Sequence, residues 1–392
     1  MVVNQVYSLL TDINHQMFGD TALQVNDLQG VISMGQTVMS GSTDAFWNQL
    51  IDRIGKVIVR KLDAELQFPN LMRNEFEWGC AIQKLTVDVF DPIENSDWNI
   101  SSGGFTPTLL DGDTGTIYQT FFTSADTWAI QRKFPENILF TAFTSAEAFG
   151  AFAEAVAAAF MDSMTISINN MARTAINNFM AEKIKAGNGV INIADLYNAT
   201  SPATPVTHAS DALLNKDFLR FSTNVIRKYM KYLSVPNVNY NVAGRLRATQ
   251  RDNLNFFCLT EYIASLESFL DSDTWHNEFV DIGEGGFTEV PYWQANLDSN
   301  ADVNEVDCVS AIKVTPSSEA GQLSPTDVEQ SGIIALMADR QAIFTGIEKR
   351  RAAAFYNPID DYTVTKMSAT IQYANDTSEN GLVFIIEPTP GP

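Results

Sequence analysis

The sequence predicts an α+β fold built around one long helix and one long β-hairpin. Apolar residues recur every three or four positions through residues 145–186, a run that contains one glycine and no proline. Strand-like alternation of apolar and polar residues occurs on both sides of this run, at 76–89 and at 362–373. Between them, residues 190–345 mix helical and strand-like segments. This mixture indicates an α+β or α/β domain next to the long helix.

Composition limits the classes of function that are open to the chain. Its 392 residues, 45% of them apolar, are enough for roughly two or three folded units with real cores. The net charge is −22, from 25 basic and 47 acidic residues. An open nucleic-acid-binding surface would therefore need a large local basic patch, and the largest basic group in the sequence is Lys349-Arg350-Arg351.

The sequence contains none of the common motifs of catalysis, phosphate binding or metal binding. There is no GxSxG elbow, no Walker A loop and no HExxH pair, and the three cysteines lie far apart with no CxxC spacing. The three histidines are scattered. Asp111-Gly112-Asp113 and Asp271-Ser272-Asp273 open like calcium loops but lack the glutamate at position twelve, so solvated turns are the better interpretation. We expect no cofactor and no metal.

The N-terminal residues 1–75 predict an arm followed by a helix. Residues 1–42 mix weak apolar patches with glycine and polar residues, which predicts an extended arm with short helical pieces. Apolar residues at helical spacing from Phe46 to Ile58 then predict a helix, with Asp44 as its N-cap.

Residues 76–130 predict an extended β-hairpin. Phe76 to Ile82 alternate in one phase and Leu85 to Val89 in the other, residues 91–116 are rich in turn formers, and 117–130 reads as the returning strand. About a dozen residues per arm reach on the order of 40 Å, and such a hairpin is unstable alone. We expect it to lie on a neighbouring subunit. The candidate contacts between subunits, including the basic cluster below, are Trp78, Ile82, Val87, Val89, Trp128, Lys349, Arg350 and Arg351.

The helix at 145–186 has recognisable ends. Thr144 and Glu147 have the spacing of a capping box, and Lys183 and Lys185 precede Gly187 at the C-terminal stop. About 40 residues give a rod of roughly 60 Å, far longer than the usual helix of about 12 residues. A rod of this length predicts a spine or an oligomer contact.

The rest of the chain predicts shorter elements. Residues 218–233 and 260–270 predict helices. Strand-like segments occur at 237–242, 278–290, 331–338, 362–373 and 382–386. The segment 331–338 is continuously apolar and predicts a strand buried on both faces. The turn 375–381 predicts that the last two strands pair as a hairpin.

The cluster Lys349-Arg350-Arg351 has three possible roles. Adjacent charges usually form a solvated corner, but in a chain of charge −22 many acidic partners are available on a neighbouring subunit. We weigh subunit pairing and solvation equally, with nucleic-acid contact third.

The order of arm, long hairpin, long helix, mixed domain and closing sheet resembles the major capsid proteins of tailed double-stranded-DNA bacteriophages. Their capsid fold is shared with encapsulins and herpesvirus shells. Phe46–Arg60 (FWNQLIDRIGKVIVR) is similar to the segment found in small short-tailed phages with protein-primed genomes. Leu336–Pro358 is similar to the strand and aromatic-Asn-Pro passage of the family.

The resemblance implies a domain plan and a function. Residues 1–75 would be the arm and lead-in helix, 76–130 the extended loop, 131–189 the first part of the peripheral domain with the spine helix, 190–345 the axial domain, and 346–392 the return to the peripheral domain. The protein would be a head protein without enzymatic activity that assembles with itself into pentamers and hexamers. These would form an icosahedral or prolate shell in the virion, assembled in the host bacterial cytoplasm.

The resemblance also implies partners. No long helical segment is expected before residue 44, so a separate scaffolding protein is implied, together with a portal protein. The shell would enclose double-stranded DNA without sequence-specific binding, and no membrane contact is expected. Three alternatives remain: an encapsulin-like nanocompartment shell, an enzyme with an acid-only site, or another virion part such as a tail or portal protein.

Overall fold

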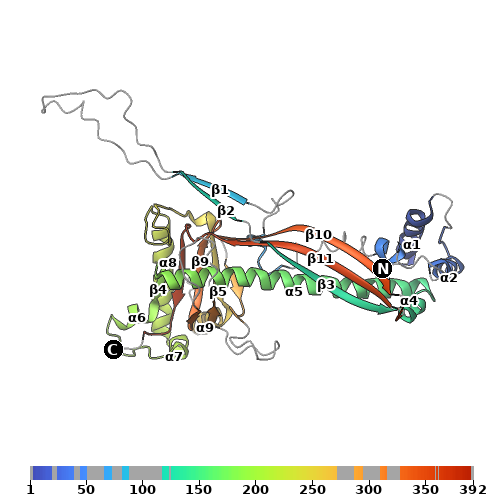
Figure 1. Ribbon diagram of the computed structural model, residues 1–392. Helices are drawn as coiled ribbons and strands as arrows, with labels where there is room; N and C mark the ends of the chain where they lie inside the picture. The colour runs from blue at the N-terminus through green and yellow to red at the C-terminus, as the bar shows by residue number, and fades with distance from the viewer. Residues whose placement is uncertain are drawn as a thin grey trace, which may run out of the picture. The chain divides into compact units, whose positions relative to one another are not determined.

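The computed structural model describes residues 3–19, 24–38, 45–50, 66–72, 82–87, 117–122, 125–271, 287–294, 310–315, 327–357, 359–360 and 362–389 (Figure 1). The chain folds into two compact units. Unit 1 comprises Met1–Gly79, Ser124–Thr174 and Phe344–Tyr373, and unit 2 comprises Cys80–Thr123, Ala175–Ile343 and Ala374–Pro392. Each unit is therefore assembled from segments that are distant in the sequence.

The N-terminal residues of unit 1 are more helical than the sequence predicts. Two helices, α1 (Val3–Phe18) and α2 (Leu28–Thr37), contact each other, and the Asp27 side chain caps α2 by accepting a hydrogen bond from the Gly30 amide at 2.7 Å. Buried apolar residues lie on both helices, at Val6, Leu10, Ile13, Val31 and Met34. The helical pieces expected in residues 1–42 are confirmed, and they are longer than predicted because apolar side chains spaced by three or four residues pack into a core.

The spine helix predicted at 145–186 is confirmed as α5 (Ala146–Ala186). Its N-cap is Ser145, whose hydroxyl accepts from the Ala148 amide at 3.1 Å, and not Thr144, which donates to the Thr141 carbonyl instead. Gly187 ends the helix with φ +70°, as expected for a glycine stop. One apolar stripe is buried along the helix, at Phe149, Ala153, Val156, Phe160, Met164, Ile168, Ala172, Ile176 and Phe179.

By length and composition α5 is apolar enough to cross a membrane. Its buried stripe is instead part of a protein core. In unit 1 this core contains residues of α1, α2, α5 and the neighbouring strands, and aromatic pairs such as Phe46–Phe149 and Trp47–Phe134 join them. The helix that begins at residue 45 supplies Phe46 and Trp47; the rest of the predicted helix, residues 51–58, lies outside the described residues.

A three-stranded sheet lies alongside α5 in unit 1 (Figure 1). Its order is β10 (Ile343–Asn357), β11 (Tyr362–Asn375) and β3 (Ala125–Pro135). From Thr363 to Ile371 the odd-numbered residues of β11 are buried, and Met367 and Ile371 belong to the same core as the stripe of α5. The even-numbered residues therefore face the other side of the sheet. A short helix, α4 (Glu136–Ala142), follows β3 directly.

Unit 2 is built on a five-stranded sheet. Its order is β4 (Val190–Asn192), β12 (Gly381–Ile385), β9 (Ile333–Asp339), β5 (Leu254–Leu259) and β6 (Thr288–Val290). The central strand β9 is buried at every position, as its continuous apolar sequence predicts. Among its described residues, this unit contains the last turns of α5 and the helices α6 (Ile193–Asn198), α7 (Ala209–Leu214), α8 (Lys216–Leu233) and α9 (Thr260–Asp271). The helices predicted at 218–233 and 260–270 are therefore confirmed. A separate two-stranded ribbon pairs β7 (Ile312–Val314) with β8 (Val328–Gln330).

The structure corrects three strand predictions. The last two strands do not pair with each other: β11 pairs with β3, whereas β12 pairs with β9 and β4. The returning strand expected at 117–130 is divided into β2 (Ile117–Phe122), which pairs with β1 (Ile82–Val87), and β3 in the other sheet. Residues 237–242 form turns with one isolated bridge, between Asn237 and Arg247. Alternation within a strand does not identify its partner.

The remaining strand prediction, at 278–290, is confirmed only at its end. Thr288–Val290 forms β6, and residues 278–286 lie outside the described residues.

Candidate assembly surface

The paired strands β1 and β2, which we call the hairpin root, have two different faces. Their antiparallel register places Leu85 opposite Gln119 and Val87 opposite Ile117, all on one face together with Gln83 and Phe121. The apolar members of this face are largely exposed: Leu85 62%, Val87 48%, Ile117 67% and Phe121 55%. Four neighbouring apolar side chains left in water indicate a surface that another molecule covers.

The opposite face of the hairpin root is fixed to the body of unit 2. The Lys84 ammonium lies 2.5 Å from an Asp376 carboxylate oxygen and 2.7 Å from one of Glu379. On the neighbouring strand, the guanidinium of Arg245 lies 3.7 Å from the centre of the Tyr118 ring. Ion pair and cation–π contact together hold the root in one orientation, so its apolar face stays turned outward.

The two carboxylates belong to residues 376–380, which we call the acidic turn. This turn joins β11 to β12, and its side chains are buried or nearly so. Asp376 accepts hydrogen bonds from the Ser378 amide and hydroxyl, and Arg247 approaches Glu379 at 3.7 Å. A buried carboxylate is stable only when it is paired in this way.

Lys183, at the C-terminal end of α5, makes a further contact with the acidic turn. It is fully buried, and its ammonium donates to the carbonyl oxygens of Tyr240 at 2.7 Å and Glu379 at 3.2 Å. Burial lowers the pKa of Lys183 from its usual 10.5 to about 7, although the nearby Asp376 and Glu379 carboxylates act in the opposite direction. The last turns of the spine helix are thus tied to the same loop that holds the hairpin root.

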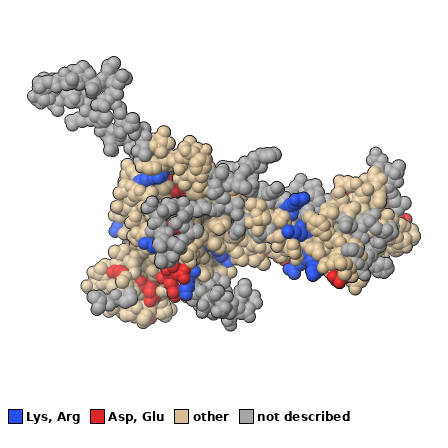
Figure 2. Space-filling model, viewed as in Figure 1, with Lys and Arg blue, Asp and Glu red and all other residues tan. Residues whose placement is uncertain are grey.

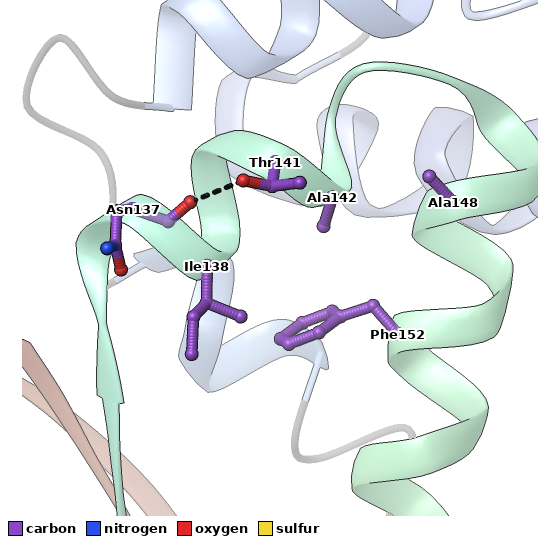
Figure 3. A pocket seen from close by; sticks show the side chains of 6 residues that line it. All are labelled: Asn137, Ile138, Thr141, Ala142, Ala148 and Phe152. Carbon is purple, nitrogen blue, oxygen red and sulfur yellow. Dashed lines mark hydrogen bonds between the residues drawn. The ribbon is translucent and has the colours of Figure 1, made fainter.

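A cavity of about 330 Å³ in unit 1 is lined by α4 and α5, and it offers no chemistry (Figure 3). Its walls are Asn137, Ile138, Thr141, Ala142, Ala148 and Phe152, of which none ionises. The Thr141 hydroxyl donates to the Asn137 carbonyl at 2.8 Å and is therefore occupied. Within the described ranges, no three His, Cys, Asp or Glu side chains lie close enough to hold a metal ion. Cys258 is buried, and burial raises the pKa of its thiol.

The eight candidate contact residues fall in three groups. Val87 lies on the exposed apolar face, and Arg351 is exposed on β10. Ile82, Trp128, Lys349 and Arg350 lie on β1, β3 and β10, but their side chains are outside the described part of the structure, as are Trp78 and Val89 altogether. Sequence reasoning missed the anchoring residues Lys84 and Tyr118. Their positions could have indicated this role, because apolar and polar residues alternate along both strands and these two lie at the polar positions.

The arrangement of elements is similar to that in solved structures of phage proteins. The chain matches the capsid structure of Staphylococcus phage Andhra with a TM-score of 0.51 and 11% identity, over 81% of this chain and 83% of that chain. A chain from the structure of the head fiber and inner core protein gp22 of native bacteriophage P68 matches with the same TM-score and identity, over 82% and 84%. At identities this low, the structural matches establish the fold alone. It is the tailed-phage capsid fold that the order of the elements predicts. A search of curated protein sequences finds no match.

The sequence itself identifies the protein family within this fold. The family model of the Phi29-like phage major capsid protein matches residues 10–385, and the chain belongs to this family. It is a phage major capsid protein and a structural component of the virion, as its resemblance to capsid proteins of small short-tailed phages indicated.

Proposed function

We propose that this capsid protein assembles with itself into pentamers and hexamers that close an icosahedral or prolate shell around double-stranded DNA. In this arrangement residues 76–130 lie across the adjacent subunit. The proposal rests on one observation: the hairpin root is fixed to its own unit by Lys84 and Tyr118, while its other face leaves Leu85, Ile117 and Phe121 in water.

Covering the apolar face of the hairpin root would contribute to the stability of a shell. Covering one large apolar side chain contributes about 1.5–3 kcal/mol, part of which is lost to the cost of association. Each subunit supplies the same face once and receives it once, so a modest contact is repeated at every subunit of a closed shell. A weak pairwise contact of this kind allows errors to be corrected during assembly and still gives a strong final shell.

The function we propose is geometric and not catalytic. Its further partners follow from the family: a separate scaffolding protein that sets curvature, a portal protein at one vertex, and DNA held without sequence-specific contacts. Assembly would take place in the cytoplasm of the host bacterium. The cluster Lys349-Arg350-Arg351 would add a charged contact between subunits to the apolar contact of the hairpin root.

The apolar face can be tested by adding charge to it. Leu85→Lys together with Phe121→Lys should leave the unassembled subunit folded, because both side chains are already exposed, and should reduce closed shells in electron micrographs by at least about tenfold. Leu214→Lys, at another exposed apolar residue of unit 2, serves as the matched control and should assemble normally. Shells from the double variant at the wild-type yield would refute the role of this face.

Deletion of residues 92–116 tests the hairpin as a whole. The deletion should give a soluble subunit that forms no closed shells. If purified wild-type protein forms no closed particles with or without a candidate scaffolding protein, the shell proposal itself fails.

A further inference from the structure

Helix α8 carries four cations along its solvent side. Lys216, Arg220, Arg227 and Lys231 are separated by four, seven and four residues, so they lie on one face of the helix. Arg220 and Lys231 are exposed, and Lys216 and Arg227 are half-buried. We call these four residues the basic stripe. The opposite side of the helix packs into unit 2 through its buried apolar residues, which are Phe218, Leu219, Val225, Ile226 and Leu233.

Further hydrogen-bond donors adjoin the basic stripe. Asn224 is exposed and lies on the same face, four residues after Arg220 and three before Arg227. Lys228 is also exposed, and its ammonium lies 5.6 Å from the centre of the Tyr232 ring. Tyr232 is 46% exposed and carries a hydroxyl. The solvent side of α8 therefore consists mainly of side chains that donate hydrogen bonds.

This composition distinguishes between two kinds of partner. A specific protein interface buries an apolar centre. In α8, all of whose residues are described, Tyr232 is the one large apolar side chain that is exposed. DNA phosphates, in contrast, accept hydrogen bonds from Arg, Lys, Asn and Tyr side chains. Because Asp217 is the one carboxylate of this helix, the face suits a row of phosphates better than it suits a protein.

The positive charge of unit 2 is concentrated in one stretch of the sequence. Residues 216–251 contain eight basic residues and one acidic residue, a net charge of +7 in a chain of −22. Residues 252–312, which follow directly, contain thirteen acidic residues and no lysine or arginine. The net charge of the whole chain therefore does not exclude a local contact with a polyanion.

The acidic surface that borders α8 lies at the N-terminal end of the helix. Figure 2 shows Asp and Glu atoms of unit 2 gathered mainly near α6 and α7, and the Tyr197 ring of α6 contacts Phe218 in the first turn of α8. Arg227 and Lys231 lie about 13 Å or more along the axis from Phe218, at about 1.5 Å per residue. This exceeds the Debye length of about 8 Å at physiological salt, so the two cations are largely screened from that acidic surface.

The length of the basic stripe fits a DNA strand. From Lys216 to Lys231 it spans about 22 Å, and a duplex presents one phosphate per about 3.4 Å of axis on each strand. About six phosphates of a strand that runs along α8 would lie beside the four cations. We propose that the basic stripe binds the phosphate backbone of double-stranded DNA without reading its bases. This inference rests on the proposed function, because it names the surface of the subunit that the enclosed DNA contacts.

Neutralising the stripe tests the contact. The unassembled full chain is titrated into a fluorescein-labelled duplex of about 30 base pairs at about 50–200 mM NaCl, and anisotropy gives the affinity. Four phosphate contacts should give a slope of log K against log salt of about −3 to −4. Arg220→Gln, Arg227→Gln and Lys231→Gln combined, which we call the stripe variant, should weaken binding at least about tenfold at about 50 mM NaCl and make the slope shallower by about three.

Two further variants make this measurement specific. Lys133→Gln, Arg351→Gln and Lys366→Gln combined remove the same charge from the three-stranded sheet of unit 1, and should leave the affinity within about twofold of the wild type. Arg220→Gln with Lys231→Gln changes only exposed side chains of α8, and glutamine has nearly the helix propensity of the residues replaced. This double variant should stay folded and make the slope shallower by about two.

Four results would overturn the proposal. The first is an absence of binding to the duplex by the wild-type chain at about 50 mM NaCl. The second is an equal loss of affinity in the stripe variant and the sheet control. The third is displacement of the duplex by poly-L-glutamate as effectively as by unlabelled DNA of equal charge, which would assign the stripe to an acidic protein. The fourth is loss of closed shells in the stripe variant while the sheet control assembles, which would make α8 a contact between subunits.

Cross-linking in particles separates this inference from the proposed function. DNA-filled particles are treated with formaldehyde, which joins lysine amines to nearby bases, and the peptides that remain attached to DNA are identified by mass spectrometry. Peptides that contain Lys228 or Lys231 should be among them. Closed, DNA-filled shells whose DNA carries no peptide of α8 would contradict the contact and leave the capsid function intact. Failure of the wild-type chain to form closed shells would instead contradict the proposed function.

Discussion

The Lys84 ammonium lies 2.5 Å from an Asp376 carboxylate oxygen, although 292 residues separate them in the sequence. This ion pair connects the hairpin root to the acidic turn between β11 and β12. The same turn accepts a hydrogen bond from Lys183 on α5. The orientation of the hairpin root is therefore set by residues from three parts of the chain, and each part can be altered separately.

We expect Lys84→Met to destabilise unit 2 and to loosen the hairpin root. Without Lys84, two buried carboxylates lose their closest cation, which should lower the free energy of unfolding by about 2 kcal/mol. Urea unfolding of the unassembled subunit measures this. Lys313→Met is the control, because its ion pair with Glu329 is 3.9 Å long and exposed, and it should cost at most about 0.5 kcal/mol. Equal effects of the two changes would show that Lys84 is no anchor.

We expect the stability of the subunit to rise with pH through the titration of Lys183. Below pH 7 this amine is charged in both the folded and the unfolded chain, and the full cost of burying the charge is present. Between its folded pKa of about 7 and its usual 10.5 the unfolded chain holds more protons, so the folded state gains stability as the pH rises.

The comparison with Lys183→Met isolates this effect. Relative to that variant, wild-type stability should increase by roughly 2 kcal/mol between pH 7 and pH 9. Chemical denaturation of the unassembled subunit at several pH values gives both curves. Parallel curves would mean that Lys183 stays charged in the fold throughout this range.

We expect Gly189→Ala to be far more damaging than Gly187→Ala, although the two glycines are two residues apart. Both have positive φ, +79° and +70°. A Cβ at Gly189 would lie 2.3 Å from the Gly381 carbonyl oxygen, whereas one at Gly187 would meet nothing within 4 Å. The first substitution should cost about 3 kcal/mol or more and the second about 1 kcal/mol. Thermal melting of both variants measures the two losses of stability. Similar losses would show that Gly189 does not lie against the Gly381 carbonyl, and would contradict the pairing of β4 with β12.

The sequence predicts the elements of this fold better than their partners. The spine helix is evident because its apolar stripe has helical spacing over many turns, and β9 is evident because it is apolar without interruption. The pairing of β11 with β3 was missed, since an alternating strand carries no mark of which edge it joins. A short turn between β11 and β12 suggested a hairpin, but the acidic turn instead passes the chain from one sheet to another.

The candidate site was predictable in outline only. Alternation identified Leu85 and Val87 as members of one strand face, and the turn-rich segment identified the hairpin. The anchoring contacts depend on residues hundreds of positions apart, which no local pattern relates. The sequence predicts Lys183 to be a cation that interacts favourably with the dipole at the end of the helix. In the structure Lys183 is buried, and it donates hydrogen bonds to two carbonyl groups.

The acidic turn also has a consequence for the chemical ageing of the shell. Its last residue forms the dipeptide Asn380-Gly381, the type of sequence at which asparagine deamidates most readily, through attack by the following backbone nitrogen. Here Asn380 is fully buried, its amide group donates to Thr249, and the Gly381 nitrogen donates to the Tyr240 carbonyl at 2.9 Å. The attacking nitrogen is thus engaged in a hydrogen bond, and the side chain that it would attack is bonded in the core. Asn188-Gly189 has the same sequence with an exposed asparagine, so isoaspartate in stored particles should accumulate at Asn188 first.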